Sequence, residues 1–597
     1  MFLLPDNYLL KFNNLQGLRL KDSYQSDYSF IKELKSLTSL DLSSNQISDA
    51  SFIKELKSLT SLGLGSNQIS DASFLKELKS LTFLSLGNNP LRIPSKTTAD
   101  SGLSAIRNYF KQIDEQGVDH IYEAKMLIVG EPGAGKTTLF KKLQDNNYVP
   151  KELTEDEKKS TVGVNIKKGW KFEHTKDKSI KFKANLWDFG GQPPQYILHQ
   201  YFLTERSLYI LLANKREENP ATFNYWFEII GTLGKNCPVL VVLNEINYDS
   251  VTKFDVSKYE REFDEINIDK KEVNFAKNDG RFQVLQKEIQ TKLSNLKHIG
   301  EALPANWIPI RRALERQKNK KYIKIDDYCR ICTKNYIPEK ESQINLLGYL
   351  RDLGTALYYE SDNHLCNYVI LDPHWVIDSL YAVLQNDVVQ KKGGKFKREF
   401  VYDLWKQKDY TTEDCQILLD LMLKGKFEIA YQINDKEFIV PFLLPYQTPN
   451  YKDVGDFNKN NIVQIHFKYD FMPPGILARL VVRLNEFICK LNGKEIVWQD
   501  GVLFESENAV AEIIELEHQE KITIKVLGEK QKEFLTYIRN KIQEIHKEWF
   551  KDRLKVDELV PCNCRICENE TEPFFYKRPL AKLVGYLKTF DKDGTTI

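Results

Sequence analysis

The sequence predicts a multidomain α/β protein with three parts: a repeat solenoid, a doubly wound α/β domain and a mixed α+β region. A period of 22 between residues 15 and 94 predicts the solenoid. A glycine-rich turn near residue 130, flanked by strand-like and helix-like runs, predicts the α/β domain. The expected parts are residues 1–98 (solenoid), 99–120 (linker helix), 121–300 (α/β domain), and 301–455 and 456–597 (two halves of the α+β region).

Length and composition exclude several classes of protein. The 597 residues leave room for about four domains. With 85 basic and 83 acidic residues, the net charge of +2 disfavours nucleic acid or an anionic membrane as the main partner. No apolar run is long enough for a membrane span, and the start of the chain lacks the basic region of a signal peptide. Nine cysteines, mostly scattered singly, indicate reduced thiols. We therefore expect a soluble, cytoplasmic protein.

The N-terminal repeat has the pattern Leu-x-x-Leu-x-Leu-x-x-Asn-x-Ile/Leu. Three copies run from Leu37 to Ile47, Leu59 to Ile69 and Leu81 to Leu91, and a degenerate copy begins at Leu15. This is the leucine-rich-repeat signature, in which leucines fill the core of a solenoid and the asparagine satisfies backbone groups at the turn. Each copy predicts one short strand and a helix-like return segment.

The concave face of this solenoid supports two readings, a surface for an unknown protein partner and a short packing module. Its side chains are small and mostly neutral, and Phe83 is the one evident anchor. The expected concave positions are Ser39, Asp41, Ser61, Gly63, Phe83 and Ser85.

Residues 99–115 predict an amphipathic helix that couples the repeats to the next domain. Leu103, Ile106, Tyr109, Phe110 and Ile113 share one face at helical spacing.

The α/β domain opens on a phosphate-binding motif. The apolar run Met126–Val129 leads into Gly-x-x-x-x-Gly-Lys-Thr and then into a helical run that ends at Leu143. This is the P-loop spacing between a strand and a helix. Backbone N–H groups wrap the phosphates, the lysine adds positive charge, and the threonine hydroxyl is a ligand for Mg²⁺. The expected binding residues are Gly130, Gly133, Gly135, Lys136, Thr137 and Thr138.

Two motifs further along suit the sensing and hydrolysis of a terminal phosphate. Thr161 follows a charged segment and can add a second hydroxyl to Mg²⁺. A strand-like run ends in Asp188-Phe-Gly-Gly-Gln192, where the carboxylate can hold Mg²⁺ through water, the Gly191 N–H can contact the γ-phosphate and Gln192 can orient the attacking water. The motifs predict Lys136, Thr161 and Gln192 as catalytic residues and Thr137, Thr161 and Asp188 as metal ligands.

After two more buried strands, 207–212 and 238–243, the sequence resembles the Roc (Ras-of-complex) domain of the Roco family, which has a small-GTPase-like fold. The resemblance implies GTP and GDP as ligands. It also implies that Asn-Lys-x-Asp and Ser-Ala-Lys motifs read the base, and the matching residues here are Asn244, Glu245, Asn247, Ala276 and Lys277.

The base motif departs from the family pattern at two positions. The family aspartate accepts two hydrogen bonds, from the N1–H and N2–H₂ groups of guanine. Asn247 offers one acceptor, and its amide N–H₂ would face one of these guanine donors. Such a mismatch typically costs about 1–3 kcal/mol. Glu245 also cannot lay an alkyl stem over the base as the family lysine does. Guanine specificity therefore rests on the resemblance. Two alternatives remain. Asp249 could replace the family aspartate if the loop is shifted, or the base specificity could be relaxed and include ATP.

From Leu303 the chain resembles the COR domain that follows Roc in this family. Ile370-Leu-Asp-Pro-His-Trp-Val376 matches the family segment Leu-Asp-Pro-x-Trp, and a strand is expected at residues 355–359. The first half is expected to be helical and winged-helix-like. The second half predicts strands at 463–467, 495–504 and 522–527 and a helix at 531–550. The resemblance implies that this half forms a homodimer.

Two groups of cysteines and one kinase-like tripeptide complete the motifs. Cys562, Cys564 and Cys567 offer three ligands where a structural zinc site needs four, so reduced thiols are favoured over zinc. Cys329 and Cys332 form a C-x-x-C on an expected helix. Asp188-Phe-Gly belongs to the phosphate-sensing motif, because no set of kinase motifs accompanies it.

The sequence leads to one main hypothesis and two alternatives. The first is a Roco-type GTPase that acts as a dimerisation-linked switch. An additional arginine, whose position the sequence does not identify, is expected to add positive charge. The alternatives are a nucleotide-sensing scaffold with slow or absent hydrolysis, and an enzyme with relaxed base specificity that hydrolyses ATP or another triphosphate.

Overall fold

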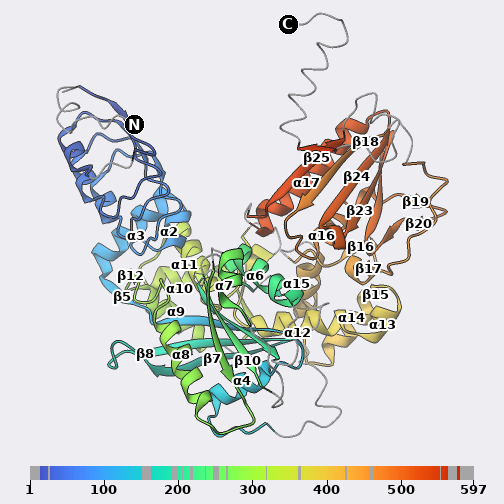
Figure 1. The fold of residues 1–597 in the computed structure, drawn as a ribbon, viewed down its shortest axis with the longest axis horizontal. Helices are drawn as coiled ribbons and strands as arrows, with labels where there is room; N and C mark the ends of the chain where they lie inside the picture. Colours follow the sequence, from blue (N-terminus) through green and yellow to red (C-terminus); the bar gives the residue numbers. More distant parts are fainter. Residues whose placement is uncertain are drawn as a thin grey trace, which may run out of the picture.

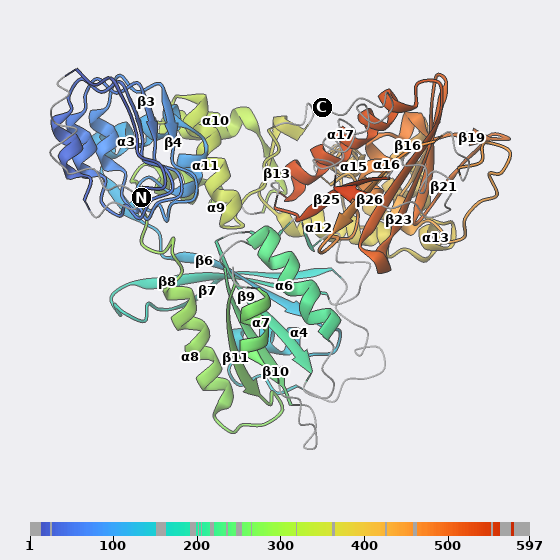
Figure 2. The same cartoon turned by 45° about the horizontal axis from the view of Figure 1, so that its top comes forward.

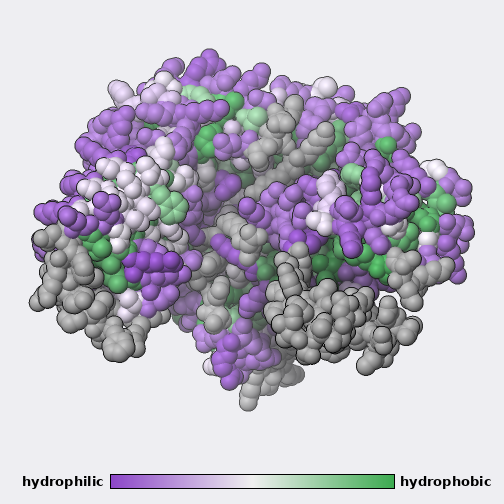
Figure 3. Space-filling view, turned by 90° about the horizontal axis from the view of Figure 1, so that it is seen from above, coloured by the Kyte–Doolittle hydropathy of each residue, from purple (hydrophilic) through white to green (hydrophobic). Residues whose placement is uncertain are grey.

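The computed structural model arranges the chain as two arms joined through a central part (Figures 1 and 2). The repeat solenoid forms one arm and a large C-terminal sheet forms the other, with the α/β domain and a helical body between them. Seen from above, the surface is mainly hydrophilic and is hollowed between the arms (Figure 3). The structure describes residues 14–23, 27–150, 163–190, 199–200, 202–204, 206–214, 220–234, 237–245, 254–263, 266–317, 319–360, 365–423, 427–457, 462–550, 553–561 and 575–577.

The solenoid has one parallel strand per repeat, and the strands pair in the order β1-β2-β3-β4. The predicted return segments are 3₁₀ helices, and the expected concave positions lie on β2 to β4. The repeat leucines are buried in one continuous core, as the pattern predicts. The elements are β1 (Gly17–Arg19), η1 (Ser29–Glu33), β2 (Ser39–Asp41), η2 (Ser51–Glu55), β3 (Ser61–Gly63), η3 (Ser73–Glu77) and β4 (Phe83–Ser85).

A ladder of asparagines joins consecutive repeats, with Asn45 and Asn67 buried and Asn89 half-buried. Asn67, with 2% of its surface exposed, donates from Nδ2 to the carbonyl oxygens of Leu42 and Leu64 at 3.0 Å each. Its Oδ1 accepts the Ile47 N–H at 3.0 Å. Asn45 and Asn89 make the equivalent bonds in the neighbouring repeats. Each asparagine therefore satisfies backbone groups from two repeats, as the sequence predicts.

The predicted linker helix is two helices. The helix is interrupted at Gly102, which has a φ angle of 97° and separates α2 (Lys96–Asp100) from α3 (Leu103–Gln116). Ile106, Tyr109 and Phe110 of α3 complete the core of the last repeat. The Tyr109 hydroxyl also donates to the Ala302 carbonyl at 2.7 Å, so α3 couples the solenoid to the rest of the chain.

The α/β domain has a six-stranded sheet in the order β11-β10-β9-β6-β8-β7. Helices α4 and α8 cover one face and α6 and α7 cover the other, which is the doubly wound arrangement that the sequence predicts. The sheet is parallel except for β7, which pairs antiparallel with β8 because the seven-residue turn between them is too short for a crossover. The elements are β6 (Glu123–Gly130), α4 (Lys136–Gln144), β7 (Val164–Glu173), β8 (Lys181–Phe189), β9 (Ser207–Asn214), α6 (Pro220–Gly234), β10 (Pro238–Asn244), α7 (Val256–Glu262), β11 (Asn267–Val273) and α8 (Arg281–Ser294).

A small antiparallel pair joins this domain to the helical body, which extends from residue 307 to residue 443. The body contains a sheet of three short strands in the order β15-β17-β16, which the helices α14 and α15 contact. The winged-helix-like character stays a prediction. The elements are β5 (Val118–His120), β12 (Ala302–Pro304), α9 (Trp307–Arg316), β13 (Tyr322–Lys324), α10 (Ile325–Lys334), α11 (Lys340–Asp352), η5 (Leu365–Asn367), β14 (Tyr368–Ile370), α12 (Pro373–Leu384), α13 (Asp387–Lys391), β15 (Lys395–Lys397), α14 (Arg398–Lys406), α15 (Thr412–Leu423), β16 (Tyr431–Asn434), β17 (Glu437–Ile439) and η6 (Pro441–Leu443).

The structure explains one predicted segment of the helical body and corrects another. In Leu-Asp-Pro-x-Trp, Asp372 caps α12 by accepting the His374 N–H at 3.1 Å, the proline is the first helical residue, and Trp375 is buried. The strand expected at 355–359 is wrong. Leu357 alone bridges to Ile370, which is the last residue of the three-residue strand β14.

The C-terminal body, residues 463–577, has a seven-stranded antiparallel sheet in the order β21-β22-β23-β24-β18-β25-β26. The predicted helix 531–550 is α17, whose apolar face packs on the sheet. Within the described residues, no helix has both the length and the apolar character that a membrane crossing needs. The elements are β18 (Val463–Tyr469), α16 (Ile476–Arg483), η7 (Asn485–Phe487), β19 (Lys490–Leu491), β20 (Lys494–Glu495), β21 (Val497–Trp498), β22 (Gly501–Ser506), β23 (Ala509–Leu516), η8 (Glu517–Gln519), β24 (Lys521–Gly528), α17 (Gln531–Phe550), β25 (Val556–Pro561) and β26 (Phe575–Lys577).

Candidate functional site

The glycines of the P-loop have backbone conformations that disfavour other residues. Gly130, Gly133 and Gly135 have φ angles of 126°, 73° and 98°. A Cβ on Gly130 would lie 2.0 Å from the Leu212 carbonyl oxygen, so the loop passes directly against β9. The turn therefore carries the chain from the end of β6 into α4 with its backbone close to the sheet edge.

Lys136 is the first residue of α4 and is buried. Its ammonium donates to the carbonyl oxygens of Gly130 at 2.9 Å and Glu131 at 2.5 Å, so the side chain folds back over the loop. Burial lowers the pKa of Lys136 to about 8, and the nearby Asp188 and Glu131 carboxylates oppose this shift. A bound phosphate would place a negative charge beside this ammonium and favour its charged form.

A buried carboxylate lies beside the start of α4. Asp188 Oδ2 accepts hydrogen bonds from the Thr137 hydroxyl at 2.8 Å and from the Asn165 amide at 3.1 Å. Its Oδ1 is buried and has no hydrogen-bond partner among the described residues. Burial raises the pKa of Asp188, and the Asn165 and Thr137 hydrogen bonds and the charge of Lys136 oppose this rise.

This arrangement fits Mg²⁺. Hydroxyl and carboxylate oxygens are the ligands that Mg²⁺ prefers, and the ion usually takes one or two from the protein and the rest from water and phosphate. The described residues contain no cluster of three or more His, Cys, Asp or Glu side chains suited to a metal. The orphaned Asp188 Oδ1 is a candidate ligand.

Four of the predicted base-reading residues, Asn244, Glu245, Ala276 and Lys277, lie at or just after the carboxyl ends of β10 and β11. Asn244 is buried, and its amide donates to the Ala134 carbonyl at 3.1 Å while its Oδ1 accepts the Phe275 N–H at 3.4 Å. It therefore ties the P-loop to the segment that follows β11. Ala276 and Lys277 lie in that segment, and the Ala276 N–H donates to Asn274 Oδ1 at 3.0 Å.

Gln200, eight residues after the predicted phosphate-sensing motif, contacts the C-terminal body. Arg479 of α16 is 1% exposed and donates from Nη2 to Gln200 Oε1 at 3.1 Å. The Gln200 amide donates to the Pro474 carbonyl at 3.2 Å. The Arg479 guanidinium carbon also lies 3.9 Å from the ring centroid of Trp549 in α17. A displacement of Gln200 would therefore act on two helices of the C-terminal body.

Family comparisons agree with this architecture. The family "Ras of Complex, Roc, domain of DAPkinase" matches residues 125–247, and "Leucine Rich repeats (2 copies)" matches 35–77. "C-terminal of Roc, COR-A domain" matches 304–444 and "C-terminal of Roc, COR-B domain" matches 460–584. The chain belongs to the Roco family. Its four matches do not include a kinase domain.

Curated Roco relatives are longer than this chain. A Roc-COR-CHAT protease from an unknown prokaryotic organism is 25% identical over 483 residues, which cover 76% of this chain and 43% of the relative. The probable serine/threonine-protein kinase pats1 of Dictyostelium discoideum is 26% identical over 549 residues, which cover 84% of this chain and 17% of the relative. The chain therefore spans less than half the length of both relatives.

A solved Roco structure also aligns with the chain. The Methanosarcina barkeri Roco2 RocCORdC structure bound to GDP is 29% identical, with a TM-score of 0.46, and the alignment covers 55% of this chain and 97% of that one.

Several predicted Roc site residues lie outside the described residues. They are Thr161, Gly191, Gln192 and Asn247, and the predictions for them stand untested. The described residues beside the first three lie close together, because the Gly190 N–H donates to the Gly163 carbonyl at 2.9 Å.

The cysteines 562, 564 and 567 are also outside the described residues. Burial raises the pKa of the Cys332 thiol on α10 to about 12, so that thiol stays protonated.

The structure also adds residues that sequence motifs did not reveal. Asn165 reaches Asp188 because β7 and β8 pair antiparallel with these two residues opposite each other. Arg281 forms an ion pair with Glu245 at 2.7 Å, beside the base-reading residues. Neither residue belongs to a motif of fixed spacing, and the strand register is the only signal for Asn165.

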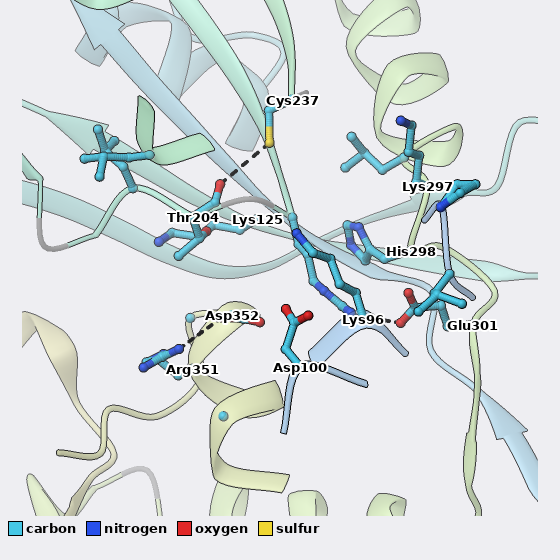
Figure 4. Close-up of a pocket in the computed structure, with 18 of the residues that line it drawn as sticks. Lys96, Asp100, Lys125, Thr204, Cys237, Lys297, His298, Glu301, Arg351 and Asp352 are labelled. Carbon is cyan, nitrogen blue, oxygen red and sulfur yellow. Dashed lines mark hydrogen bonds and ion pairs between the residues drawn. The ribbon is translucent and has the colours of Figure 1, made fainter. Parts of the chain in front are cut away.

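A large cavity of about 1960 Å³ lies at the opposite end of the Roc sheet (Figure 4). Lys125 and Cys237 line it at the amino ends of β6 and β10, and the last repeat and α11 of COR-A complete it. Burial lowers the pKa of Lys125 to about 7, with Asp352 opposing the shift. Because the P-loop lies at the carboxyl ends of the strands, this cavity is a domain junction separate from the phosphate-binding loop.

Proposed function

We propose that this Roco protein binds GTP and GDP with Mg²⁺ in its Roc domain and hydrolyses GTP as a switch that the COR domain reads. The observation that carries the proposal is the buried Asp188 carboxylate beside Lys136 and Thr137. One oxygen accepts the Thr137 hydroxyl and the other has no partner among the described residues. Beside a P-loop, this donor set suits a nucleoside phosphate with Mg²⁺.

The residues of the loop would act mainly by positioning and charge neutralisation. The backbone N–H groups of the P-loop and the Lys136 ammonium would hold the phosphates. Thr137 and Asp188 would hold Mg²⁺, which supplies positive charge against the phosphate oxygens when it is bound. From their places in the sequence, Thr161 would add a second hydroxyl and Gln192 would orient the attacking water.

Two described contacts support a connection between this site and the COR domain. Gln200, just after the phosphate-sensing motif, bonds to Arg479 of COR-B. Lys168 on β7, the strand that follows Thr161, donates to the Leu371 carbonyl of COR-A at 3.2 Å. A COR contact therefore follows each sensing motif in the sequence. The proposal also includes a homodimer through COR-B and a cytoplasmic location. It further includes a protein partner that binds the repeats around Phe83, which is 60% exposed.

Hydrolysis is expected to release several phosphates per protein molecule when GTP and Mg²⁺ are in excess. Asp188→Asn removes the charge that would hold the ion, so we expect a rate about 10–100-fold lower. The measurement is phosphate release over many turnovers. Asp177→Asn in the exposed turn between β7 and β8 is the matched control and should leave the rate unchanged. Phosphate release that never exceeds one per molecule would overturn hydrolysis and favour the scaffold function.

The affinity for GDP is expected to fall as pH rises through the pKa of Lys136. This pKa is about 8 without ligand, and a bound phosphate raises it, so binding takes up a proton above that pH. The affinity should therefore be fully present near pH 7 and fall about four-fold by pH 8.5. Calorimetric titrations over this range provide the measurement. The same decline in Lys136→Ala would contradict the assignment to this lysine.

A further inference from the structure

The carboxyl ends of β10 and β11 form the edge at which a base would lie. A ligand of a doubly wound sheet binds outside the carboxyl ends of the strands. Asn244 holds this edge against the P-loop through Ala134, and a Cβ on Gly135 would lie 2.7 Å from the Asn244 amide nitrogen. A nucleoside whose phosphates lie on the loop therefore brings its base to the residues after β10 and β11.

The guanidinium of Arg281 lies at this edge and is hydrogen-bonded to two carboxylates. Arg281, the first residue of α8, donates from Nη1 to Glu245 Oε2 at 2.7 Å and from Nε to Asp279 Oδ2 at 2.8 Å. Its Nη2 also lies 2.7 Å from Asp279 Oδ2. The side chain is 35% exposed. The two carboxylates fix the guanidinium by its edges, and such in-plane bonds leave the faces of the group available for stacking.

The backbone of Glu245 is held at the end of β10. Its N–H donates to the Val273 carbonyl at 2.8 Å, which extends the pairing of β10 with β11 by one residue. Partly exposed ion pairs contribute little to stability, typically about 0–1 kcal/mol. Three partly exposed charged groups in a fixed arrangement at the base edge therefore suggest a ligand contact more strongly than a stabilising one.

We propose that Arg281 covers the base of the bound nucleotide, with its guanidinium plane stacked on the purine, and that Glu245 and Asp279 position it. The ligand class is purine nucleoside di- and triphosphates, so this inference rests on the proposed function. Stacking uses the π-face that every base has, so it adds affinity without choosing guanine over adenine. It therefore supplies affinity in a site whose base motif has Asn247 where the family has an aspartate.

The test uses the full chain with Mg²⁺, GDP, ADP, xanthosine diphosphate and CDP, with pyrophosphate as the probe that lacks a base. Arg281→Ala should weaken the three purine nucleotides roughly 5- to 100-fold, CDP less, and pyrophosphate not at all. Arg261→Ala, on α7 of the same domain, is the matched control and should change none of these affinities. The charge-reversed pair Glu245→Lys with Arg281→Glu returns a cation to this edge and should recover part of the purine affinity.

Each contrary result has a defined meaning. Equal losses for GDP and pyrophosphate with a lower Tm would show a merely structural clamp and overturn the proposal. Unchanged GDP affinity in Arg281→Ala would overturn it as well. A native protein that binds neither pyrophosphate nor any nucleotide would overturn the proposed function, and this inference with it.

Discussion

Replacing Lys136 with alanine is expected to cause the largest loss of nucleotide binding. Removal of one partner from a buried, hydrogen-bonded charge contact costs about 2–5 kcal/mol, roughly 30- to 5,000-fold in Kd. Lys136 is 6% exposed and already lies on the carbonyl groups of the loop, so it is in place for the phosphates. Calorimetric titration of GDP with and without Mg²⁺ is the measurement.

Lys141→Ala is the matched control for this variant, because Lys141 lies on the same helix and is exposed. It should bind GDP as the native protein does. Burial lowers the pKa of Lys136, so folding disfavours its charge and its loss should not lower the Tm of the ligand-free protein. Equal losses of affinity in both lysine variants would contradict the proposed role of Lys136.

Replacing Asn67 with alanine is expected to have the largest effect on the stability of the solenoid. The change leaves the buried N–H of Ile47 without its acceptor. The carbonyl groups of Leu42 and Leu64 each lose one of two asparagine donors and keep the other, from Asn45 and Asn89. A buried group without a partner costs about 1–3 kcal/mol, so we expect the free energy of unfolding of the repeats to fall by about 1–3 kcal/mol.

Hydrogen exchange followed by mass spectrometry can measure this effect within the repeats. Backbone amides of residues 38–70 should exchange faster in Asn67→Ala than in the native protein, because exchange reports local opening. Gln68→Ala is the matched control, since Gln68 is the exposed neighbour of Asn67. Similar exchange in the two variants would show that the asparagine ladder does not stabilise the solenoid.

The repeats were predictable in detail because each unit contacts mainly its neighbours. The period of the leucines placed β2, β3 and β4, and the asparagine pattern placed the ladder. The linker was harder to predict. Apolar spacing predicted a helical face that includes Ile106 and Tyr109, and that face is buried, but the break at Gly102 followed from a backbone angle that the spacing does not encode.

The phosphate half of the site was predictable because its residues are contiguous. The P-loop spacing placed Lys136 and Thr137 at the start of a helix, and the order of the motifs predicted that Asp188 would serve the same ion as Thr137. The structure places these two side chains 2.8 Å apart. The base edge was less predictable, because Glu245 and Arg281 are 36 residues apart and meet only through the pairing of β10 with β11.

The sequence by itself determined the order of the domains, the repeat period and the phosphate-binding loop. These features depend on hydrophobic periodicity and on glycines at fixed spacing, which act over a few residues. Only the tertiary structure decided that Asn165 reaches Asp188 and that Arg479 reaches Gln200, 279 residues away. Such contacts depend on strand register and domain packing, which follow from the burial of whole faces of sheets and helices and from no local motif.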